Sequence, residues 1–409
     1  MHLCFSIKMK KKDVKWEKLV ELGYCLSLLH LSQQSSYRKY IKSLFMKKDK
    51  LTVFLCTPLF PPSVGGAATY TSILVEKLLE KMDFCRFIIL TTKVRGVKTL
   101  SVNDRTIILR FLLTPYYGSS YSKKVLITLI NNIIALIIGF GVLILFKISV
   151  CHVMANSYFH FIARLMYLLK VIVIIDMRSQ YSAKLNIPGY IYISCSENIT
   201  EIAKESLPNG KPLVYIPVQI NREDLDSLNI DKIKDLGDRY SPFLLYVGEI
   251  RESKGVGLLI ESFKIFNKKN NNKYKLLLIG PNHCKDNCKD EENIYILNGK
   301  TVQEVYHYMA AAELLILPSK SEGMPRVCLE ALYLKKKVLC PSCVPEFRRY
   351  IPRFIVESDC SVWLAEKIEA VLSCPDYPNY PLAQHIDEKV YDVFKSLYCI
   401  KMNKTDPEK

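Results

Sequence analysis

Short apolar runs alternate with longer mixed stretches along this chain from residue 51 onward. The runs are three to six residues long and rich in Val, Ile, Leu and Phe, and helix-length stretches separate them. Strands that are apolar on both faces and alternate with helices are typical of parallel sheets covered on both sides. The pattern therefore predicts an α/β protein with a doubly wound architecture.

The alternating pattern runs twice. The first series of predicted strands covers 51–56, 86–90, 106–110, 149–154, 171–175, 191–194 and 213–216. The second series covers 243–247, 275–279, 294–297, 314–317 and 338–340. A chain of 409 residues exceeds what one hydrophobic core usually serves, so two Rossmann-like domains are expected.

The charged segment between the two series, NREDLDSLNIDKIKDLGDRYS, lacks a strong apolar period and indicates a domain boundary. The expected parts are an N-terminal extension at 1–45, a first domain at 46–220, a linker at 221–242, a second domain at 243–375, and a C-terminal helix and tail at 376–409. Helical sequence after Pro381 is expected to cross back to the first domain. A native start at Met46 is an open alternative.

Positive charge is unevenly distributed along the chain. The formal net charge is +17, and residues 1–50 alone carry 12 Lys or Arg against 4 Asp or Glu. No stretch has basic residues interleaved with aromatic residues, as nucleic-acid-binding proteins do. Nucleic acid is therefore not an expected partner. An anionic membrane surface or a phosphate-bearing substrate is favoured instead.

The 14 cysteines predict free thiols in a reducing cytosol, because no signal peptide is recognised at the start of the chain. Two groups allow a metal or redox alternative: His283 with Cys284 and Cys288, and the CxxC pair Cys340 and Cys343. Zinc needs four ligands and no second pair stands at a familiar spacing, so buried or loop thiols are favoured. No metal site is predicted.

One segment, 125–146 (VLITLINNIIALIIGFGVLILF), has 22 residues without a charge. Its length fits a transmembrane helix, a partly exposed helix that dips into a bilayer, or a buried crossover helix before the next strand. Basic residues flank it at Lys123, Lys124 and Lys147, which makes peripheral attachment to a membrane an expectation.

The strongest local signal for chemistry is LLILPSKSEGMPRVCLEALYLKKKVLCPS, which reads as strand, loop, helix and strand. Pro325 fits the first helical turn, and Gly323 lets the backbone approach a ligand. The amides of Gly323, Met324 and the first turn then form a site at the carboxyl end of a strand. This site can bind an anion and sugar hydroxyls.

Two carboxylates bracket this turn, with seven residues between Glu322 and Glu330. Glu330 stands among apolar neighbours, where a carboxylate is costly to bury unless it is hydrogen-bonded. A ribose diol donates two hydrogen bonds to one carboxylate, and a hexose offers hydroxyls to the loop carboxylate. For a lone glutamate, a solvated or salt-bridged helix position would be the favoured interpretation.

The segment SEGMPRVCLEA resembles the signature of the retaining glycosyltransferases of family four, in glycosyl transferases group 1, which have the GT-B fold. Upstream, LLYVGEIRESKGVGLLIESF is similar to the family's strand, loop and helix that hold the donor diphosphate. The resemblance places Lys254 on that diphosphate, after Gly248. The family usually has Arg directly after the first glycine; here Glu249 stands there, and Arg251 two residues later is its expected substitute.

A third stretch, FPPSVGGAATYTSILVEKL, resembles the family's first loop, in which paired glycines let the backbone approach the donor phosphates. Gly65 and Gly66 occupy those positions. The chain departs from the family at VIVIIDMRSQY, which has Asp176 and Arg178 but no His, and at IPVQI in place of an IPNG turn. His152 in the preceding strand is expected to pack or to face a neighbouring loop.

The resemblance implies two domains that face a central cleft, with the acceptor on the first domain and the donor on the second. It implies retaining transfer of a hexose from a nucleoside-diphosphate sugar to an acceptor hydroxyl. A sugar or a lipid-linked glycan is the expected acceptor. The apolar segment and the basic surface favour a membrane-held acceptor, such as a lipid-linked saccharide of the cell envelope, with the protein in the cytoplasm or on the inner face of the cytoplasmic membrane. The expected catalytic residues are Lys254, Glu322 and Arg251, and the expected donor-binding residues are Gly65, Gly66, Gly248, Lys254, Glu322, Gly323, Met324 and Glu330. No cofactor is expected beyond the donor, which is a substrate. Open alternatives are a non-catalytic membrane-associated scaffold and a nucleotide-sugar epimerase.

Overall fold

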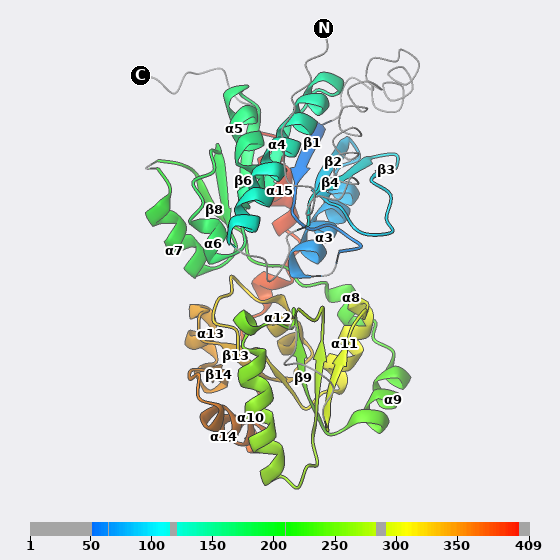
Figure 1. Cartoon of the computed structure of the whole chain (residues 1–409), viewed down its shortest axis with the longest axis vertical. Helices are drawn as coiled ribbons and strands as arrows, with labels where there is room; N and C mark the ends of the chain where they lie inside the picture. The colour runs from blue at the N-terminus through cyan, green and yellow to red at the C-terminus, as the bar shows by residue number, and fades with distance from the viewer. Residues whose placement is uncertain (1–50, 64, 115–120, 209, 284–291, 401–409) are drawn as a thin grey trace, which may run out of the picture.

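Two α/β domains are stacked along the long axis of the molecule (Figure 1). The computed structural model describes residues 51–63, 65–114, 121–208, 210–283 and 292–400. The N-terminal domain holds the blue-to-green half of the chain, and the C-terminal domain holds the yellow-green-to-orange half. In both, strands with almost fully buried side chains form the centre of the domain.

The described part of the N-terminal domain contains an eight-stranded sheet in the order β3-β4-β2-β1-β5-β6-β7-β8. All neighbours pair in parallel except β3 and β4, which are antiparallel. Its strands are β1 (Leu51–Cys56), β2 (Cys85–Thr92), β3 (Leu100–Val102), β4 (Thr106–Leu112), β5 (Val150–Met154), β6 (Ile172–Met177), β7 (Ile191–Ser194) and β8 (Leu213–Tyr215).

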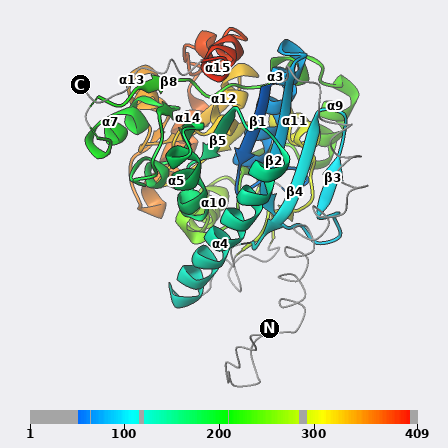
Figure 2. The ribbon, with the colours of Figure 1, turned by 90° about the horizontal axis from the view of Figure 1, so that it is seen from above.

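Helices cover both faces of this sheet (Figure 2). They are α3 (Gly66–Lys81), α4 (Tyr121–Leu145), η1 (Ser157–Phe159), α5 (His160–Leu168), α6 (Gln180–Ala183) and α7 (Glu197–Ser206). The central strand β1 packs into both cores, because Phe54 and Cys56 face one side and Val53 and Leu55 the other.

The described part of the C-terminal domain contains a six-stranded parallel sheet in the order β11-β10-β9-β12-β13-β14. Its strands are β9 (Phe243–Val247), β10 (Lys275–Ile279), β11 (Ile294–Leu297), β12 (Leu314–Ile316), β13 (Lys337–Pro341) and β14 (Ile355–Val356). Its helical elements are η2 (Glu252–Lys254), α10 (Val256–Lys269), α11 (Val302–Ala311), α12 (Arg326–Tyr333), α13 (Pro345–Tyr350), η3 (Pro352–Phe354), α14 (Ser361–Ser373) and η4 (Ala383–His385).

The segment between the two sheets, expected as a linker, contains two helices, α8 (Arg222–Asp226) and α9 (Ile230–Tyr240). Each begins at an asparagine whose side chain accepts a hydrogen bond from the first turn: Asn221 from the amide of Asp224, and Asn229 from that of Lys232. Helix α9 packs against α11, so it lies with the C-terminal domain.

The chain returns to the N-terminal domain at its C-terminal end. Helix α15 (Val390–Tyr398) packs against α3, and its buried residues Val390, Phe394 and Tyr398 belong to the same hydrophobic core as β1 and β2. This is the helix expected beyond Pro381. The N-terminal domain is therefore built from two distant parts of the chain.

Helix α4 is the one described helix that is long and apolar enough to cross a membrane by length and composition. It connects β4 to β5, which both belong to one sheet. A transmembrane helix would put these strands on opposite sides of the bilayer, so this sequence-based alternative is wrong. The buried Asn131 anchors the helix, because its side chain bonds both backbone groups of Leu113 just after β4.

The cysteines of the CxxC sequence, Cys340 and Cys343, are free thiols, and Cys340 is fully buried in β13. Cys284 and Cys288 lie outside the described residues. Within the ranges that the structure describes, no three His, Cys, Asp or Glu side chains gather as metal ligands would.

Candidate active site

A cavity of about 650 Å³ lies between the two domains. Its walls follow the carboxyl ends of strands in both sheets, where ligands bind in open α/β folds. The lining includes all nine residues that the sequence predicted for the site: Gly65, Gly66, Gly248, Arg251, Lys254, Glu322, Gly323, Met324 and Glu330. Two of them come from the N-terminal domain and seven from the C-terminal domain.

Lys254 and Glu322 meet in this cavity. The Lys254 Nζ atom lies 2.5 Å from Oε1 of Glu322, and both side chains are largely buried. Lys254 ends η2, and Gly255 then adopts φ 73° before α10 begins. A Cβ atom at Gly255 would lie 2.3 Å from the carbonyl oxygen of Pro318, so glycine is what lets this turn pack against the loop that carries Glu322.

Glu330 is held from two sides within the C-terminal domain. The Tyr306 hydroxyl donates to its Oε1 atom at 3.0 Å, and Arg326 donates to the same atom at 3.0 Å from one turn earlier in α12. Burial raises the pKa of Tyr306, which keeps the hydroxyl protonated and able to donate. The cost of burying Glu330 is thus offset by protein groups, while the residue still lines the cavity.

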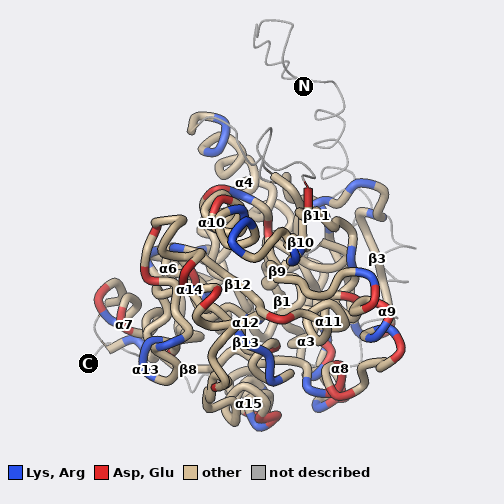
Figure 3. Tube along the Cα trace, turned by 90° about the horizontal axis from the view of Figure 1, so that it is seen from below, with Lys and Arg blue, Asp and Glu red and all other residues tan. Residues whose placement is uncertain are grey.

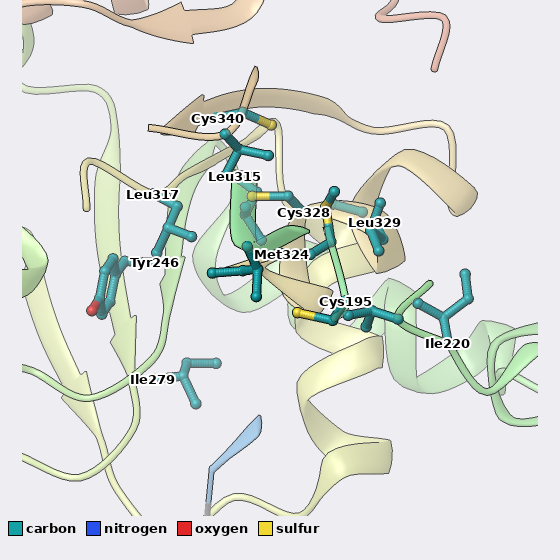
Figure 4. Close-up of a cluster of buried hydrophobic side chains, with 14 of the residues drawn as sticks. Cys195, Ile220, Tyr246, Ile279, Leu315, Leu317, Met324, Cys328, Leu329 and Cys340 are labelled. Carbon is teal, nitrogen blue, oxygen red and sulfur yellow. The ribbon is translucent and has the colours of Figure 1, made fainter. Parts of the chain in front are cut away.

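The loop before α12 contacts the N-terminal domain. At Gly323, a Cβ atom would lie 2.3 Å from the carbonyl oxygen of Arg178 in the N-terminal domain. Pro325 caps α12 instead of occupying its first turn, one residue from the position predicted. Figure 4 shows Met324 and Leu317 in one apolar cluster with Cys195, which comes from the N-terminal domain.

Arg251 lines the cavity close to Glu249, with its Nε atom 3.1 Å from Oε2 of that carboxylate. Both side chains are partly exposed. The acidic residue that stands directly after Gly248 therefore forms an ion pair with the arginine that the sequence offered as a substitute.

The N-terminal domain contributes the start of α3. Gly65 is the N-cap of this 16-residue helix and makes no side-chain capping bond, and Gly66 and Ala67 line the cavity after it. The free amides of a helix start attract negative charge through hydrogen bonding and the helix dipole. They lie across the cavity from the domain that carries Lys254.

Behind α3, a buried polar network joins Arg178 to the C-terminal helix. Arg178 contacts Asp176 through Nε at 2.6 Å and lies over the ring of Tyr70, whose hydroxyl also bonds Asp176. His152 lies 3.4 Å from Asp176 on one side, and its Nδ1 atom lies 2.5 Å from the Tyr398 hydroxyl on the other. His152 thus packs in the core, as expected.

The charge of Asp176 is fixed by this network. Burial raises the pKa of the carboxyl group, but the charge of Arg178 and the hydrogen bond from His152 lower it by more. The pKa therefore lies below its usual value. Asp176 is therefore ionised and holds the Arg178 guanidinium at the cavity wall.

Sequence reasoning gave no role to Arg326 and left out other polar residues of the cavity wall, including Thr69, Tyr70, Asn298, Lys300 and Tyr306. Arg326 could have been identified from the sequence, because it stands inside the recognised motif, four residues before Glu330. Tyr306 could not have been identified, because its contact with Glu330 joins two separate helices.

Cationic side chains outnumber acidic ones on the cavity wall. Arg178, Arg251, Lys254, Lys300 and Arg326 line it together with Glu249, Glu322 and Glu330, which gives a net charge of +2. A net positive lining favours an anionic ligand.

The family model described as "Glycosyl transferases group 1" matches residues 230–392. We call residues 230–392 the group 1 region, because they match this family model. This group 1 region contains Lys254, Glu322 and Glu330 and ends inside α15.

Two curated relatives of this chain are named for the biosynthesis of teichuronic acid and of capsular polysaccharide. The chain is 29% identical over 153 residues to the teichuronic acid biosynthesis glycosyltransferase TuaC of Bacillus subtilis (strain 168). It is 26% identical over 167 residues to the capsular polysaccharide biosynthesis glycosyltransferase CapM of Staphylococcus aureus. These matches cover 37% and 38% of this chain, and the chain spans 38% and 43% of the relatives' own lengths.

The fold of the whole described chain is that of known two-domain glycosyltransferases. It is similar to sucrose-phosphate synthase from Thermosynechococcus elongatus, with a TM-score of 0.64 and 14% identity over 85% of this chain and 96% of that one. It is also similar to the E. coli trehalose-6-phosphate protein bound with UDP-2-fluoro glucose, with a TM-score of 0.59 and 12% identity over 86% and 99%. The chain has the GT-B fold that its sequence predicted.

Proposed function

We propose that this protein is a retaining glycosyltransferase that moves a hexose from a nucleoside-diphosphate sugar to an acceptor hydroxyl. The observation that carries the proposal is the Lys254–Glu322 pair, which sits in a cavity with a net positive lining opposite the start of α3. A diphosphate fits between these two positive elements, and a sugar attached to it would reach the loop that carries Glu322.

The transfer needs one bond to break and one to form at the anomeric carbon. The bond from this carbon to the diphosphate oxygen breaks with its electron pair on the oxygen, and the acceptor oxygen bonds to the carbon on the same face. The acceptor proton passes to the departing diphosphate. No protein nucleophile is needed, so the protein's task is to stabilise the developing negative charge on the diphosphate.

Lys254 is the main cation for that task. Glu322 holds its Nζ atom inside the cavity, and an ammonium group has three donors, so two remain for phosphate oxygens. Arg251 and the amides at Gly66 and Gly323 add donors around the same volume. In this arrangement Glu322 orients Lys254 and accepts hydrogen bonds from the transferred sugar.

Glu330 is the proposed site of the donor ribose. Tyr306 and Arg326 both donate to Oε1, which fixes the carboxylate at the wall of the cavity. A ribose diol would bind the carboxylate through its remaining acceptor capacity. Gly248 lets the backbone between β9 and η2 lie close to the same ligand.

We propose a cell-envelope glycan or a lipid-linked saccharide as the acceptor, with the reaction on the cytoplasmic side of the membrane. The names of TuaC and CapM, which concern teichuronic acid and capsular polysaccharide, support this acceptor class. Arg178 and Tyr70 face the cavity from the N-terminal domain, where the acceptor would approach, and Asp176 binds both from behind the cavity wall.

The Lys254→Ala variant tests the proposal. Removing one charge-stabilising donor typically raises a barrier by about 2.7 to 4 kcal/mol, which is about 100- to 1,000-fold in rate. Because Arg251 and the cavity amides remain, we expect turnover to fall by at least roughly tenfold while the folded structure is retained. The measurement is nucleoside-diphosphate release from UDP-, GDP- and ADP-sugars in the presence of envelope lipid extracts. Lys268→Ala, an exposed position at the far end of α10, is the matched control.

Binding of the free nucleotide separates the proposal from its alternatives. A nucleoside diphosphate at about 100 times its dissociation constant stabilises the protein by about 2.7 kcal/mol, which thermal unfolding detects. No response to UDP, GDP or ADP would favour a non-catalytic scaffold. Conversion of the donor sugar without transfer would favour an epimerase.

A further inference from the structure

Helices α4 and α5 together expose an unusual amount of apolar surface. Phe140 of α4 keeps 55% of its surface exposed, and Leu168 at the end of α5 keeps 69%. The two helices contact each other, so their exposed residues lie on neighbouring elements. We define the apolar face by Val125, Leu126, Leu129, Ile133, Phe140, Ile144, Phe161, Leu168 and Leu169.

The pattern of α4 differs from that of an ordinary surface helix. Its inner side is buried through Ile134, Ala135, Ile138 and Val142, but its outer side is apolar as well. Helix α14 shows the usual pattern in the same protein, because it buries Leu364 and Ile368 and exposes glutamates. A helix that is apolar all round needs an apolar environment on its outer side too.

The surroundings of the apolar face are positively charged. Residues 105–175 contain no Asp or Glu. Five basic residues in this stretch are exposed on or next to the two helices: Lys123, Lys124, Lys147, Arg164 and Lys170. Figure 3 shows α4 as a largely uncharged helix with basic residues at its protruding end.

The face also reaches the level of the cavity. Asn131 binds Leu113 just beyond the carboxyl end of β4, so the first turns of α4, from Tyr121 onward, extend past that edge of the sheet. In Figure 1 the lower end of α4 comes down to the level of α3 and α6, the elements nearest the C-terminal domain.

We propose that the apolar face of α4 and α5 docks on an anionic phospholipid bilayer, with α4 lying in the plane of the interface. Apolar side chains enter the acyl boundary, and the lysines and arginine bind lipid headgroups, as in monotopic helices. The face does not suit a second copy of the chain, because a two-fold dimer would place its basic rims against each other. This docking does not depend on the proposed transfer reaction.

Vesicle co-sedimentation of the full chain tests the docking surface. Vesicles of phosphatidylcholine alone are compared with vesicles that also contain phosphatidylglycerol. We expect strong binding to the anionic vesicles and at least about fivefold weaker binding to the neutral ones, because each lysine near an anionic surface contributes roughly a fivefold gain. Lys123→Glu with Lys124→Glu should remove much of this difference.

The apolar contribution is tested by Phe140→Glu with Leu168→Glu. Both positions are exposed, so the variant is expected to fold, and circular dichroism with thermal unfolding checks this. Binding to anionic vesicles should fall at least about tenfold, because charged groups replace apolar ones in the interface. Val362→Glu, an exposed apolar position on α14, is the matched control and should bind like the original chain.

Three outcomes would overturn the proposal. One is absence of vesicle binding by the original chain. Another is equal binding of the folded Phe140→Glu, Leu168→Glu variant, which would assign the binding to the basic residues 1–50, present in every variant. The third is a dimer in light scattering that this variant dissociates, without vesicle binding, which would assign the face to a second copy.

Discussion

At Gly323 the two domains approach so closely that no side chain fits between them. The position where a Cβ atom would lie is 2.3 Å from the carbonyl oxygen of Arg178 and 3.4 Å from the sulfur of Cys195. The backbone of the motif loop thus rests on the N-terminal domain. Any larger residue at 323 must push the domains apart.

The Gly323→Ala variant should therefore be impaired in closing the cavity. Misplacement of a catalytic arrangement by about 1 Å can cost about 100-fold in rate, so a loss of tenfold or more in kcat/KM is expected. Small-angle scattering should show a larger radius of gyration. Gly257→Ala is the control, because nothing lies within 4 Å of the added methyl group; equal activity and equal size for both variants would contradict the role of Gly323.

The sequence predicted which residues gather in the cavity better than it predicted how they bond. Glu322, Glu330 and Lys254 were recognisable because they stand in segments that resemble the family's motifs, and all three line one cavity. The Tyr306–Glu330 bond could not be foreseen, since it is a buried contact between two helices, α11 and α12, that are separate in the sequence. The roles of Lys254, Glu322 and Glu330 in the reaction stay predictions.

At the scale of elements, α15 is the part of the C-terminal sequence that completes the N-terminal core. Its residues Tyr391, Phe394 and Tyr398 are buried with residues of α3 and β2. The Tyr398 hydroxyl also lies against His152, which connects this helix to the Asp176 and Arg178 network. The helix therefore supports one wall of the cavity from behind.

Phe394→Ala should destabilise the N-terminal domain by about 3 to 5 kcal/mol, because it removes a fully buried aromatic ring and leaves a cavity. Chemical unfolding followed by fluorescence measures the change. Val393→Ala, at the exposed neighbouring position, should cost far less. If both variants unfold at the same denaturant concentration, α15 does not contribute as the packing indicates.

The sequence predicted strands well where they are apolar and central, as for β1 and β9, whose bounds match the apolar runs. It missed β3, which has three residues, two of them exposed, and pairs antiparallel at the sheet edge. It also missed the two-residue β14. Helix α9 was overlooked because it buries none of its residues fully, so it leaves a weak apolar signal.

At the scale of the whole molecule, the domains are joined by polar contacts as well as by the returning chain. Glu346 of α13 accepts a hydrogen bond from the amide of Glu197 at the start of α7, and Arg349 forms two bonds to the Glu197 carboxylate. Between the domains, buried His385 donates from Nδ1 to the carbonyl oxygen of Val218 at 2.7 Å.

His385 gives the molecule a pH-dependent stability. Burial lowers its pKa, so the folded protein keeps it neutral, whereas the unfolded chain takes up a proton near pH 6.5. The contribution to stability is complete above about pH 6.5 and is lost as the pH falls below it, by up to about 1.4 kcal/mol per pH unit.

We therefore expect the thermal unfolding midpoint of the original chain to decrease as the pH is lowered from about 7.5 to about 5.5. The decrease should be less steep in His385→Gln. Thermal unfolding across this range measures both. An identical slope for the variant and the original chain would show that His385 takes no part.

The return of α15 to the first domain sets an order for synthesis of the protein. Residues 51–220 leave the ribosome long before residues 390–398, yet the core around β1 and β2 contains side chains from both. Domains generally fold as units during translation, the N-terminal one first. Here the first domain stays incomplete until residues 390–398 have been made, and the nascent chain carries an uncovered side of α3 while the second domain is being made.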